Sequence, residues 1–363
     1  MRAGGAERAV FQLVCEQRRR GVLADLAIAS DPGSFGEQLN EAGGTVHLLR
    51  CRGAWDIGRS LKLTKIASRY PIVHVHGIEP LLIFAVSRAD CVPVYTHRGG
   101  ARDYGWTKRC RQAAARPYVR RFAAISGNTT HSAYVVARWL GLPVERIAVV
   151  HNGLNFALLE PTRTRADVLA ELRIASGSAS LIVGTASTLQ PWKRVELLLQ
   201  ALAETADDIH CVVLGDGPSR DDLEGLTIML GIADRVTFLG RKDHVGDYLQ
   251  LLDAFVLPSG PEEAFGNAAV EAMGVGVPTV IFGDGGGLTE HVIDGKTGLI
   301  VRDVSELTTS LLRLRNDAQF RAALGAAGRE FVRRSYSLDA MFERYEAFYD
   351  AALRSLRSPT STQ

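Results

Sequence analysis

The sequence lacks any apolar run long enough to cross a membrane as a helix. The longest runs, such as PLLIFAV at 80–86, are far shorter than the about 20 residues that a spanning helix needs. The amino-terminal MRAGGAERAV has no apolar segment of a secretory signal. The five cysteines are odd in number, scattered and without a C-x-x-C pair, which argues for reduced thiols and against a disulfide framework or a zinc site. We therefore expect a cytoplasmic protein.

The sequence also lacks an even distribution of charge, although its net charge is only +2. Residues 1–150 hold 22 lysines and arginines against 11 acidic residues, whereas residues 151–363 hold 20 against 29. The densest basic stretch, 98–121, has eight basic residues against Asp103 alone. It is either a solvated helix face or a surface for an anionic acceptor or anionic lipid headgroups. The candidate contacts in it are Arg109, Arg111, Arg120 and Arg121.

Short β-branched segments alternate with helix-length segments along the whole chain of 363 residues. Predicted strands in the first half lie at 23–30, 45–51, 72–77, 92–97, 122–126 and 147–153. Those in the second half lie at 180–187, 210–217, 235–240, 254–259, 278–283 and 297–301. This alternation is typical of parallel sheets covered by helices on both faces. Two such halves predict an α/β protein of two doubly wound, Rossmann-like domains facing across a cleft.

The domain boundary is predicted from an irregular stretch, 151–165, that separates the two sets of strands. We expect residues 1–155 to form an amino-terminal, acceptor-side domain and residues 156–336 a carboxyl-terminal, donor-binding domain. Residues 337–363 begin with a strong helical period after a Ser337 cap. We expect this helix to pack back toward the amino-terminal domain and to end in a frayed tail.

One strand of the usual pattern is missing at the start of the chain. A doubly wound domain opens with a strand that leads into a glycine turn and a helix. Here the chain opens directly in RAGGAERAVFQLVCEQRRRG, at 2–21. The absence of a central strand would leave unpaired backbone groups beside it. Either the neighbouring strands close up or the natural start lies upstream of Met1, and we favour the second because consistency across levels favours a complete fold.

The stretch GPEEAFGNAAVEAMGVGVP, 260–278, reads as the turn and helix that follow a strand. Asn267 is expected to cap the helix, and Gly266 to let the backbone approach a ligand closely. The four free amides of the first helical turn would then form an anion site suited to a diphosphate. Glu271 lies one turn further on and can accept hydrogen bonds from ribose hydroxyls, whereas Glu263 lies in the loop ahead, nearer to the group that the phosphate carries.

At this point the sequence resembles the retaining glycosyltransferases of family four, group 1, which have the GT-B fold. Their signature has a glutamate, seven residues and a second glutamate, written here Glu263–AFGNAAV–Glu271. The resemblance covers nearly the whole chain, less well between 31 and 120. Its other motifs are GGAERAV (4–10), FAAISGNTT (122–130), VERIAVVHNGLN (144–155), VVLGDGP (212–218), RVTFLG (235–240), AFVLPSG (254–260) and GGLTEHVIDGKTGLIV (286–301).

The resemblance implies a nucleotide-sugar donor in the carboxyl-terminal domain and an acceptor on the amino-terminal domain. It assigns Glu271 to the donor ribose and Glu263 to the donor sugar. Lys193 matches the lysine that neutralises the diphosphate as charge develops on the leaving group. His97, at the end of a predicted strand, matches a histidine near the transferred sugar. Further matches to donor-binding positions are Phe265, Gly266, Asn267, Ala268 and, in the amino-terminal glycine loop, Gly4 and Gly5.

One position departs from the family pattern. The family has an arginine five residues before the lysine, and Thr188 stands there in this chain. Threonine cannot replace the bidentate fork of a guanidinium. Arg194, next to Lys193, is a candidate substitute in donor binding. The departure motivates a second hypothesis, that the chain is a catalytically impaired or inactive relative that acts as a binding partner.

Motifs for metals and dinucleotides are weak or missing. No D-x-D pair occurs, so the metal-bridged diphosphate site of the other main glycosyltransferase fold is not expected. His74 and His76 share one strand face but have no evident third ligand, so we interpret them as strand-end packing. GDGGG, at 283–287, lacks the G-x-G-x-x-G spacing of a nicotinamide enzyme. Leaving-group stabilisation would rest on Lys193 and the helix amides, with no metal and no cofactor.

We therefore predict a retaining hexosyltransferase that uses a UDP-, GDP- or ADP-sugar. The acceptor would be a glycan or a lipid-linked molecule in the synthesis of cell-envelope polysaccharide or lipopolysaccharide. The basic amino-terminal half suits an anionic acceptor and peripheral contact with the inner face of the membrane, and nucleic acid is not expected as a partner. A nucleotide-sugar epimerase on the same two-domain plan is a further alternative.

Overall fold

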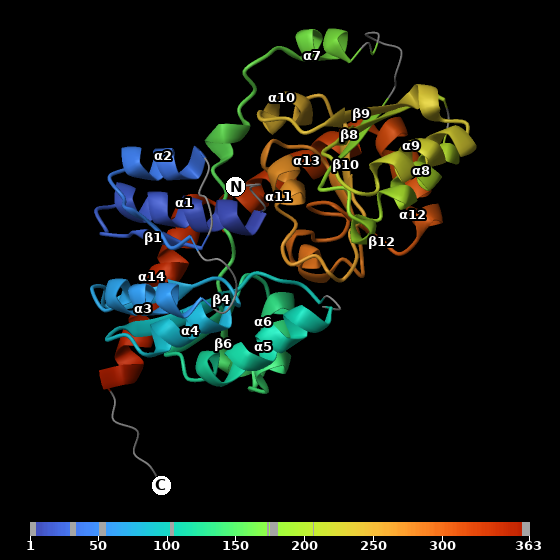
Figure 1. Ribbon diagram of the computed structural model, residues 1–363. Coiled ribbons are helices and arrows are strands. Elements are labelled where there is room, and N and C mark those ends of the chain that lie inside the picture. The colour runs from blue at the N-terminus through green and yellow to red at the C-terminus, as the bar shows by residue number, and fades with distance from the viewer. Residues whose placement is uncertain are drawn as a thin grey trace. The chain divides into compact units, whose positions relative to one another are not determined.

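A computed structural model describes residues 5–29, 34–50, 56–101, 105–172, 174, 181–205 and 207–357. The chain divides into two compact units, of which unit 1 comprises residues 1–154 and 338–363 and unit 2 comprises residues 155–337. Every named strand of both units pairs in parallel with its neighbours (Figure 1). Each of the twelve predicted strand regions overlaps a strand, so the expectation of an α/β protein with parallel sheets is confirmed.

Unit 2 is built on one six-stranded sheet of order β12-β11-β10-β7-β8-β9. The sheet grows outward in both directions from β7, which makes it doubly wound. Its strands are β7 (Leu181–Ala186), β8 (Ile209–Leu214), β9 (Val236–Gly240), β10 (Ala254–Leu257), β11 (Thr279–Phe282) and β12 (Leu299–Val301). Its helices are η2 (Phe156–Leu159), α7 (Arg165–Glu171), η3 (Pro191–Lys193), α8 (Val195–Ala203), α9 (Arg220–Met229), η4 (Ala233–Arg235), α10 (Val245–Leu249), α11 (Asn267–Gly274), η5 (Gly286–His291), α12 (Val304–Asn316) and α13 (Ala318–Ser335).

The sheet of unit 2 is buried because its strands are apolar on both faces. Every residue of β10 and β11 is buried, as expected for central strands with helices on each side. Leu198 and Leu199 of α8 and Leu311 of α12 lie in one hydrophobic core with residues of β7 and β8. This continuous core fixes the carboxyl ends of the strands, from which the loops of the candidate site emerge.

Unit 1 has two separate sheets, a two-stranded sheet β1-β2 and a four-stranded sheet β3-β4-β5-β6. Its strands are β1 (Leu26–Ile28), β2 (Val46–Leu48), β3 (Ile72–Val75), β4 (Val92–His97), β5 (Ala124–Gly127) and β6 (Ile147–Val149). Its helices are α1 (Gly5–Arg19), α2 (Ser34–Glu41), α3 (Ile57–Ala67), α4 (Pro80–Ser87), α5 (Trp106–Val119), α6 (Thr130–Leu140), η1 (Val144–Arg146) and α14 (Leu338–Arg357). Since β1 and β3 belong to different sheets, the strands on either side of the expected gap do not close up.

The last helix, α14, packs within unit 1 although the sequence of unit 2 precedes it. Its apolar residues Met341, Tyr345 and Phe348 form a core cluster with Leu13 of α1 and Val94 of β4. Figure 1 shows α14, in red, beside the blue α1. The helical period read from the sequence is therefore the period of a buried face.

Candidate functional site

The candidate site of unit 2 lies at the carboxyl ends of β7 and β10. These two strands are neighbours in the sheet, although β8 and β9 lie between them in the sequence. Ligands of doubly wound sheets bind at such a point, where the strand order reverses, because the loops on either side diverge. The loop after β7 carries Thr188 and Lys193, and the loop after β10 carries Glu263.

Lys193 and Glu263, 70 residues apart in the sequence, form an ion pair in this site. The Lys193 Nζ lies 2.5 Å from Glu263 Oε2, with side chains that are 12% and 10% exposed. The same ammonium lies 4.2 Å from the centroid of the Trp192 ring. The structure thus brings together two residues that the family resemblance assigns to donor binding.

The ion pair holds Glu263 in its charged form. Burial alone would raise the pKa of this carboxyl, but the Lys193 ammonium and the hydrogen bonds that the carboxyl accepts outweigh it, so the pKa is lowered. The other carboxylate oxygen accepts from the Gly266 amide at 3.1 Å. Burial of a charge is costly unless it is paired and hydrogen-bonded, and both conditions are met here. A ligand that brings its own anion to Lys193 would release Glu263 to accept hydrogen bonds.

Arg194 links the loop after β7 to the loop after β10. Its Nε donates to the Pro258 carbonyl at 2.8 Å and its Nη2 to the Ser259 carbonyl at 3.0 Å. The guanidinium also pairs with both oxygens of Asp284, at 2.8 and 2.6 Å. These contacts occupy four of the five donors of the fork, which leaves little for a phosphate. The sequence analysis did not identify Asp284, which lies in the stretch read as a weak dinucleotide motif.

Gly215, in the loop after β8, packs closely against the loop after β7. Gly215 follows β8 with a φ of +114°, and a Cβ built on it would lie 1.8 Å from the Ser187 carbonyl oxygen. Only glycine fits this backbone and this contact. The loops after β7 and β8 therefore lie directly against each other, which positions the turn that leads to Thr188 and Lys193.

The start of α11 differs from the prediction in its cap. Gly266, not Asn267, is the capping residue; it has a φ of +79°, and Asn267 is already the first helical residue. Glycine takes the left-handed conformation without strain, whereas an asparagine cap has an extended backbone. A Cβ on Gly266 would also lie 2.5 Å from a side-chain carbon of Leu288. The glycine thus serves the turn and its packing.

The prediction of four free amides at this helix start is wrong for two of them. The amides of Ala269 and Val270 donate to the Gly266 carbonyl at 2.9 and 3.4 Å. The Val270 bond is the ordinary first bond of the helix, and the Ala269 bond is a shorter-range contact of the 3₁₀ type. Asn267 and Ala268 are half-buried at the tip of the turn, and Glu271 is buried one turn further on.

The Phe265 ring contacts other aromatic side chains. Its centroid lies 4.3 Å from that of His291 and 5.5 Å from that of Tyr336, and the ring is buried. The Phe265 carbonyl also accepts from His291 Nε2 at 2.6 Å. Phe265 therefore anchors the loop before α11 through its ring and its carbonyl.

Thr188 is exposed in the loop after β7 and supplies no charge. The described site contains two cations, Lys193 paired with Glu263 and Arg194 paired with Asp284.

His97 of unit 1 ends β4 and is buried. Burial, assisted by the charge of Lys108, lowers its pKa to about 4, so the imidazole is neutral near pH 7. Its Nδ1 lies 3.2 Å from the Tyr95 hydroxyl. Its buried Nε2 has no hydrogen-bond partner among the residues that the structure describes. Such a nitrogen suits a hydrogen bond to a substrate hydroxyl.

The remaining predicted residues of unit 1 lie on its helices. Gly5 is the first residue of α1, so it is helical and does not form a loop, and Gly4 lies outside the described residues. The predicted basic contacts are all exposed, on α5 and just after it: Arg109, Arg111, Arg120 and Arg121. The adjacent Trp106 is 79% exposed. A basic surface with an exposed tryptophan is typical of contact with anionic lipid or glycan.

The described residues contain neither a cluster of metal ligands nor a helix that could span a membrane. No group of three histidine, cysteine or acidic side chains in the described ranges has the arrangement of a metal site. The two nitrogens of His74 contact the hydroxyls of Tyr349 and Thr96, at 2.8 and 2.7 Å. No helix within those ranges combines the length and hydrophobicity required to cross a bilayer.

Comparison with protein families gives two matches that together span most of the chain. The model described as Glycosyltransferase Family 4 matches residues 3–158. The model described as Glycosyl transferases group 1 matches residues 173–331. The two matched segments fall on the two units of the structure.

Curated relatives are similar over part of their length. The D-inositol 3-phosphate glycosyltransferase of Stackebrandtia nassauensis is 32% identical over 259 residues, 66% of this chain and 57% of that protein. The lipopolysaccharide core biosynthesis glycosyltransferase LpsD of Rhizobium meliloti is 33% identical over 156 residues, 42% of this chain and 44% of that protein. The chain spans about half the length of the curated relatives it matches.

A solved structure extends the likeness to the whole fold. HepE of Anabaena in complex with UDP has a TM-score of 0.84 with this chain at 21% identity, covering 96% of each chain. At this identity the likeness shows the fold alone.

Proposed function

Because the chain belongs to the group 1 glycosyltransferases of family four and has their GT-B fold, we propose that it transfers a sugar from a nucleotide-sugar donor, with retention of configuration. The observation that carries the proposal is the Lys193–Glu263 ion pair at the point where the strand order of unit 2 reverses. A diphosphate needs a cation, and a sugar needs a carboxylate acceptor. HepE has been solved with UDP and with UDP-glucose, so UDP-sugars are the first donors to test.

In the proposed complex the donor diphosphate takes the place of Glu263 beside Lys193. The Lys193 ammonium then neutralises charge that develops on the leaving group. Glu263 accepts hydrogen bonds from the donor sugar, and Glu271 accepts them from the ribose. The tip of the turn at Asn267 and Ala268 lies against the phosphates.

The proposed reaction needs no protein nucleophile. The acceptor oxygen forms a bond to the anomeric carbon from the side of the leaving group. The bond from that carbon to the β-phosphate oxygen breaks, and its electron pair leaves with the nucleoside diphosphate. A β-phosphate oxygen takes the acceptor proton. In this scheme His97 Nε2 contacts a hydroxyl of the transferred sugar, and its low pKa keeps it neutral for that role.

The experiment that tests the proposal is release of nucleoside diphosphate by the purified chain. UDP-, GDP- and ADP-sugars are supplied with and without a cell-envelope extract, and the anomeric configuration of any product is read by NMR. Acceptor-dependent release from one donor, with retention, is expected. Lys193→Ala should lower the release by about 10²–10³-fold, whereas Lys296→Ala, which removes an exposed lysine of the same unit, should leave it unchanged.

Two outcomes would replace the proposal by another function. Thr188 and the engagement of Arg194 with Asp284 leave one cation for the diphosphate, which favours an inactive, nucleotide-binding relative as second candidate. Nucleotide binding by calorimetry with no release from any donor would establish that candidate. Interconversion of donor sugars without an acceptor would instead identify an epimerase.

For the acceptor we propose an anionic glycan or lipid-linked glycan of the cell envelope, reached at the inner face of the membrane. The exposed arginines on and after α5, beside Trp106, and the basic excess of residues 1–150 support this proposal. The relative LpsD, named for lipopolysaccharide core synthesis, supports it as well. Reversal of the charges at Arg109, Arg111, Arg120 and Arg121 should abolish binding to anionic liposomes. Reversal of four exposed arginines of unit 2 is the matched control, at Arg241, Arg313, Arg329 and Arg334.

A further inference from the structure

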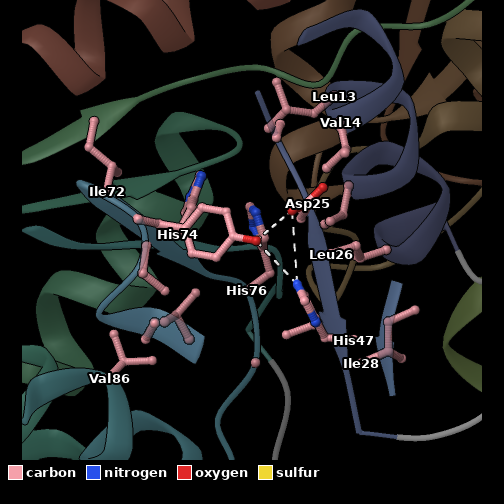
Figure 2. Close-up of a pocket in the computed structure, with 18 of the residues that line it drawn as sticks. Leu13, Val14, Asp25, Leu26, Ile28, His47, Ile72, His74, His76 and Val86 are labelled. Carbon is pink, nitrogen blue, oxygen red and sulfur yellow. Dashed lines mark hydrogen bonds and ion pairs between the residues drawn. The ribbon is translucent and has the colours of Figure 1, made fainter. Parts of the chain in front are cut away.

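Unit 1 contains a cavity of about 550 Å³ between its two sheets. Figure 2 shows Leu26 and Ile28 of β1 on one side of it and Ile72 and His74 of β3 on the other. Leu13 of α1 also lines it. We call this space between the facing edges of β1 and β3 the strand slot.

On the β1 side, one backbone position is directed into the slot. The Leu26 amide donates to the Thr45 carbonyl at 3.0 Å, and the Ile28 carbonyl accepts from the Leu49 amide at 2.8 Å. Leu26 and Ile28 therefore face β2. Successive residues of a strand direct their backbone groups to alternate edges, so the amide and carbonyl of Ala27 face the slot.

On the β3 side, two positions face the slot by the same reasoning. The Pro71 carbonyl accepts from the Val92 amide at 2.8 Å, which directs Pro71 and Val73 toward β4. The backbone groups of Ile72 and His74 are then directed away from β4. No strand in the described part of the chain pairs with this edge of β3 or with the facing edge of β1. Ala27 is exposed in the slot and β3 is half-buried, and strand edges left open in this way are templates for a further strand.

The residues of β3 are less buried than those of a central strand, as expected for a strand that borders a cavity. All four of its residues are only half-buried, whereas all four residues of β10 in unit 2 are buried. Both strands are apolar in the main and belong to parallel sheets with helices packed on them. The slot is lined mainly by apolar side chains, so an occupant that removes them from water would stabilise unit 1.

Several polar side chains that line the slot have partners. Asp25 accepts from the Tyr70 hydroxyl at 2.5 Å, and His74 contacts Tyr349 and Thr96 through its two ring nitrogens. The backbone groups of Ala27 and His74 on the slot side have no strand partner among the described residues. A further strand satisfies backbone groups, whereas a polar small molecule would be recognised by side chains.

The order of the elements along the chain indicates which strand would occupy the strand slot. In a strand–helix–strand crossover the strand before the helix lies beside and parallel to the strand after it. Helix α1 leads into β1, and β2 already occupies the other edge of β1. A strand directly ahead of α1 would therefore lie on the open edge of β1, which is the slot.

We propose that the slot is filled by a β-strand of this same polypeptide, encoded ahead of residue 1. The strand runs parallel between β1 and β3 and joins the two sheets of unit 1 into one. It has about five or six residues, the usual strand length. It is apolar on both faces, because α1 and α14 as well as α3 and α4 line the slot. This inference does not depend on the transferase activity.

The test is hydrogen exchange on two forms of the protein, the chain from Met1 and the chain extended in frame through the codons that precede it. The upstream codons should specify an apolar run that leads into the glycines before α1. In the extended chain the amides of Ala27, Ile72 and His74 should exchange at least about tenfold more slowly. The amides of Leu26 and Val73, which face paired edges, should change much less and serve as internal controls.

A grafted strand gives a second test that needs no upstream sequence. The segment of β8, Ile209–Leu214, is fused ahead of Arg2 as a strand known to be buried in this protein. The graft should slow exchange at Ala27 and His74 and raise the melting temperature. The same graft with proline in place of its second and fourth residues is the control, because proline cannot donate to a sheet.

Four results would overturn the proposal. One is an upstream reading frame closed by a stop codon before any apolar run. Another is equal exchange at Ala27 and His74 in the extended and original chains. The third is dimerisation of the original chain by light scattering with protection of the same amides, which would assign the slot to a second copy. Binding of anilinonaphthalene sulfonate should be lost on extension, and its retention would identify an open ligand cavity instead.

Discussion

The two units have the same kind of architecture but differ in the continuity of their sheets. Unit 2 has six parallel strands in one ladder, whereas unit 1 has six parallel strands divided between two ladders. In unit 2 the central strands are fully buried, and β3 of unit 1 is half-buried along its whole length. The centre of a doubly wound sheet is therefore where a missing strand leaves a cavity and open backbone groups.

The two units also differ in the polar side chains that lie near the centres of their sheets. In unit 2, neighbouring central strands β7 and β10 direct two loops together, and the Lys193–Glu263 pair results. In unit 1 the corresponding centre is the strand slot, and His97 lies at the end of β4, one strand further along the sheet from β3.

The largest effect should come from the ionic site of unit 2. Lys193→Ala should lower donor turnover by about 10²–10³-fold, because it removes the cation that stabilises the leaving group. Release of nucleoside diphosphate measures the effect, with Lys296→Ala as control. A turnover within twofold of the parent would show that unit 2 does not hold the leaving group through Lys193.

Matched truncations should sharpen the comparison of the two sheets. Ile281→Ala in the fully buried β11 should cost about 2–5 kcal/mol. Ile72→Ala in β3 should cost about 1 kcal/mol, because its side chain already borders open space. Urea unfolding with hydrogen exchange read separately in each unit gives both values. Equal losses would contradict the idea that β3 lacks a neighbour.

As the pH falls, unit 1 should lose stability first. The Lys193–Glu263 ion pair of unit 2 should break only at a lower pH. Burial lowers the pKa of His97 to about 4, so its contribution to stability is present above the unfolded value of about 6.5 and is lost as pH falls toward 4. The loss amounts to about 3 kcal/mol. The pKa of Glu263 is lowered too, so its contribution is lost only below the ordinary glutamate value of about 4.3.

Exchange measured from pH 7 to 4 tests this order. His97→Gln should remove the part of the decline of unit 1 that comes from His97, since glutamine does not titrate in this range, whereas His74 and His76, whose pKa values burial also lowers, should keep contributing. The same substitution should leave the acid profile of unit 2 unchanged. A parent protein whose two units lose protection together above pH 5 would contradict the assignment.

The smallest effect is expected at Glu271. Glu271→Ala should weaken nucleotide binding by about tenfold, the value of one or two hydrogen bonds to a carboxylate. Calorimetry with UDP or UDP-glucose measures it, and Glu330→Ala, an exposed acid on α13, is the control. Unchanged affinity in the Glu271 variant would undo the ribose assignment.

The sequence predicted the elements well because hydrophobic period is a local property. All twelve strand regions were found, although most strands are shorter than predicted; the first, predicted at 23–30, is Leu26–Ile28. The periodic helix near the carboxyl terminus is α14. Strand ends depend on partners, and β1 has a partner on one edge only. Its length could not be read from its own residues.

The errors and omissions in the site arise from contacts between distant segments. The cap at Gly266 depends on Leu288, and the brace at Arg194 depends on Asp284, 90 residues away. No local pattern encodes such pairs. Glu263, Glu271 and Lys193 could be identified from the sequence because they match the family's motif. The motif identifies residues of the site but does not show what they contact.

Gly215 limits how this chain can evolve. A methyl group there would meet a main-chain oxygen of the neighbouring loop at 1.8 Å, so even alanine is excluded. At Gly225 nothing lies within 4 Å and the backbone is ordinary, so a library should accept most residues. In a deep mutational scan selected for folded protein, the codon for Gly215 should stay invariant while that for Gly225 drifts. An invariant codon at Gly215 would therefore mark the place where the loops after β7 and β8 are in direct contact.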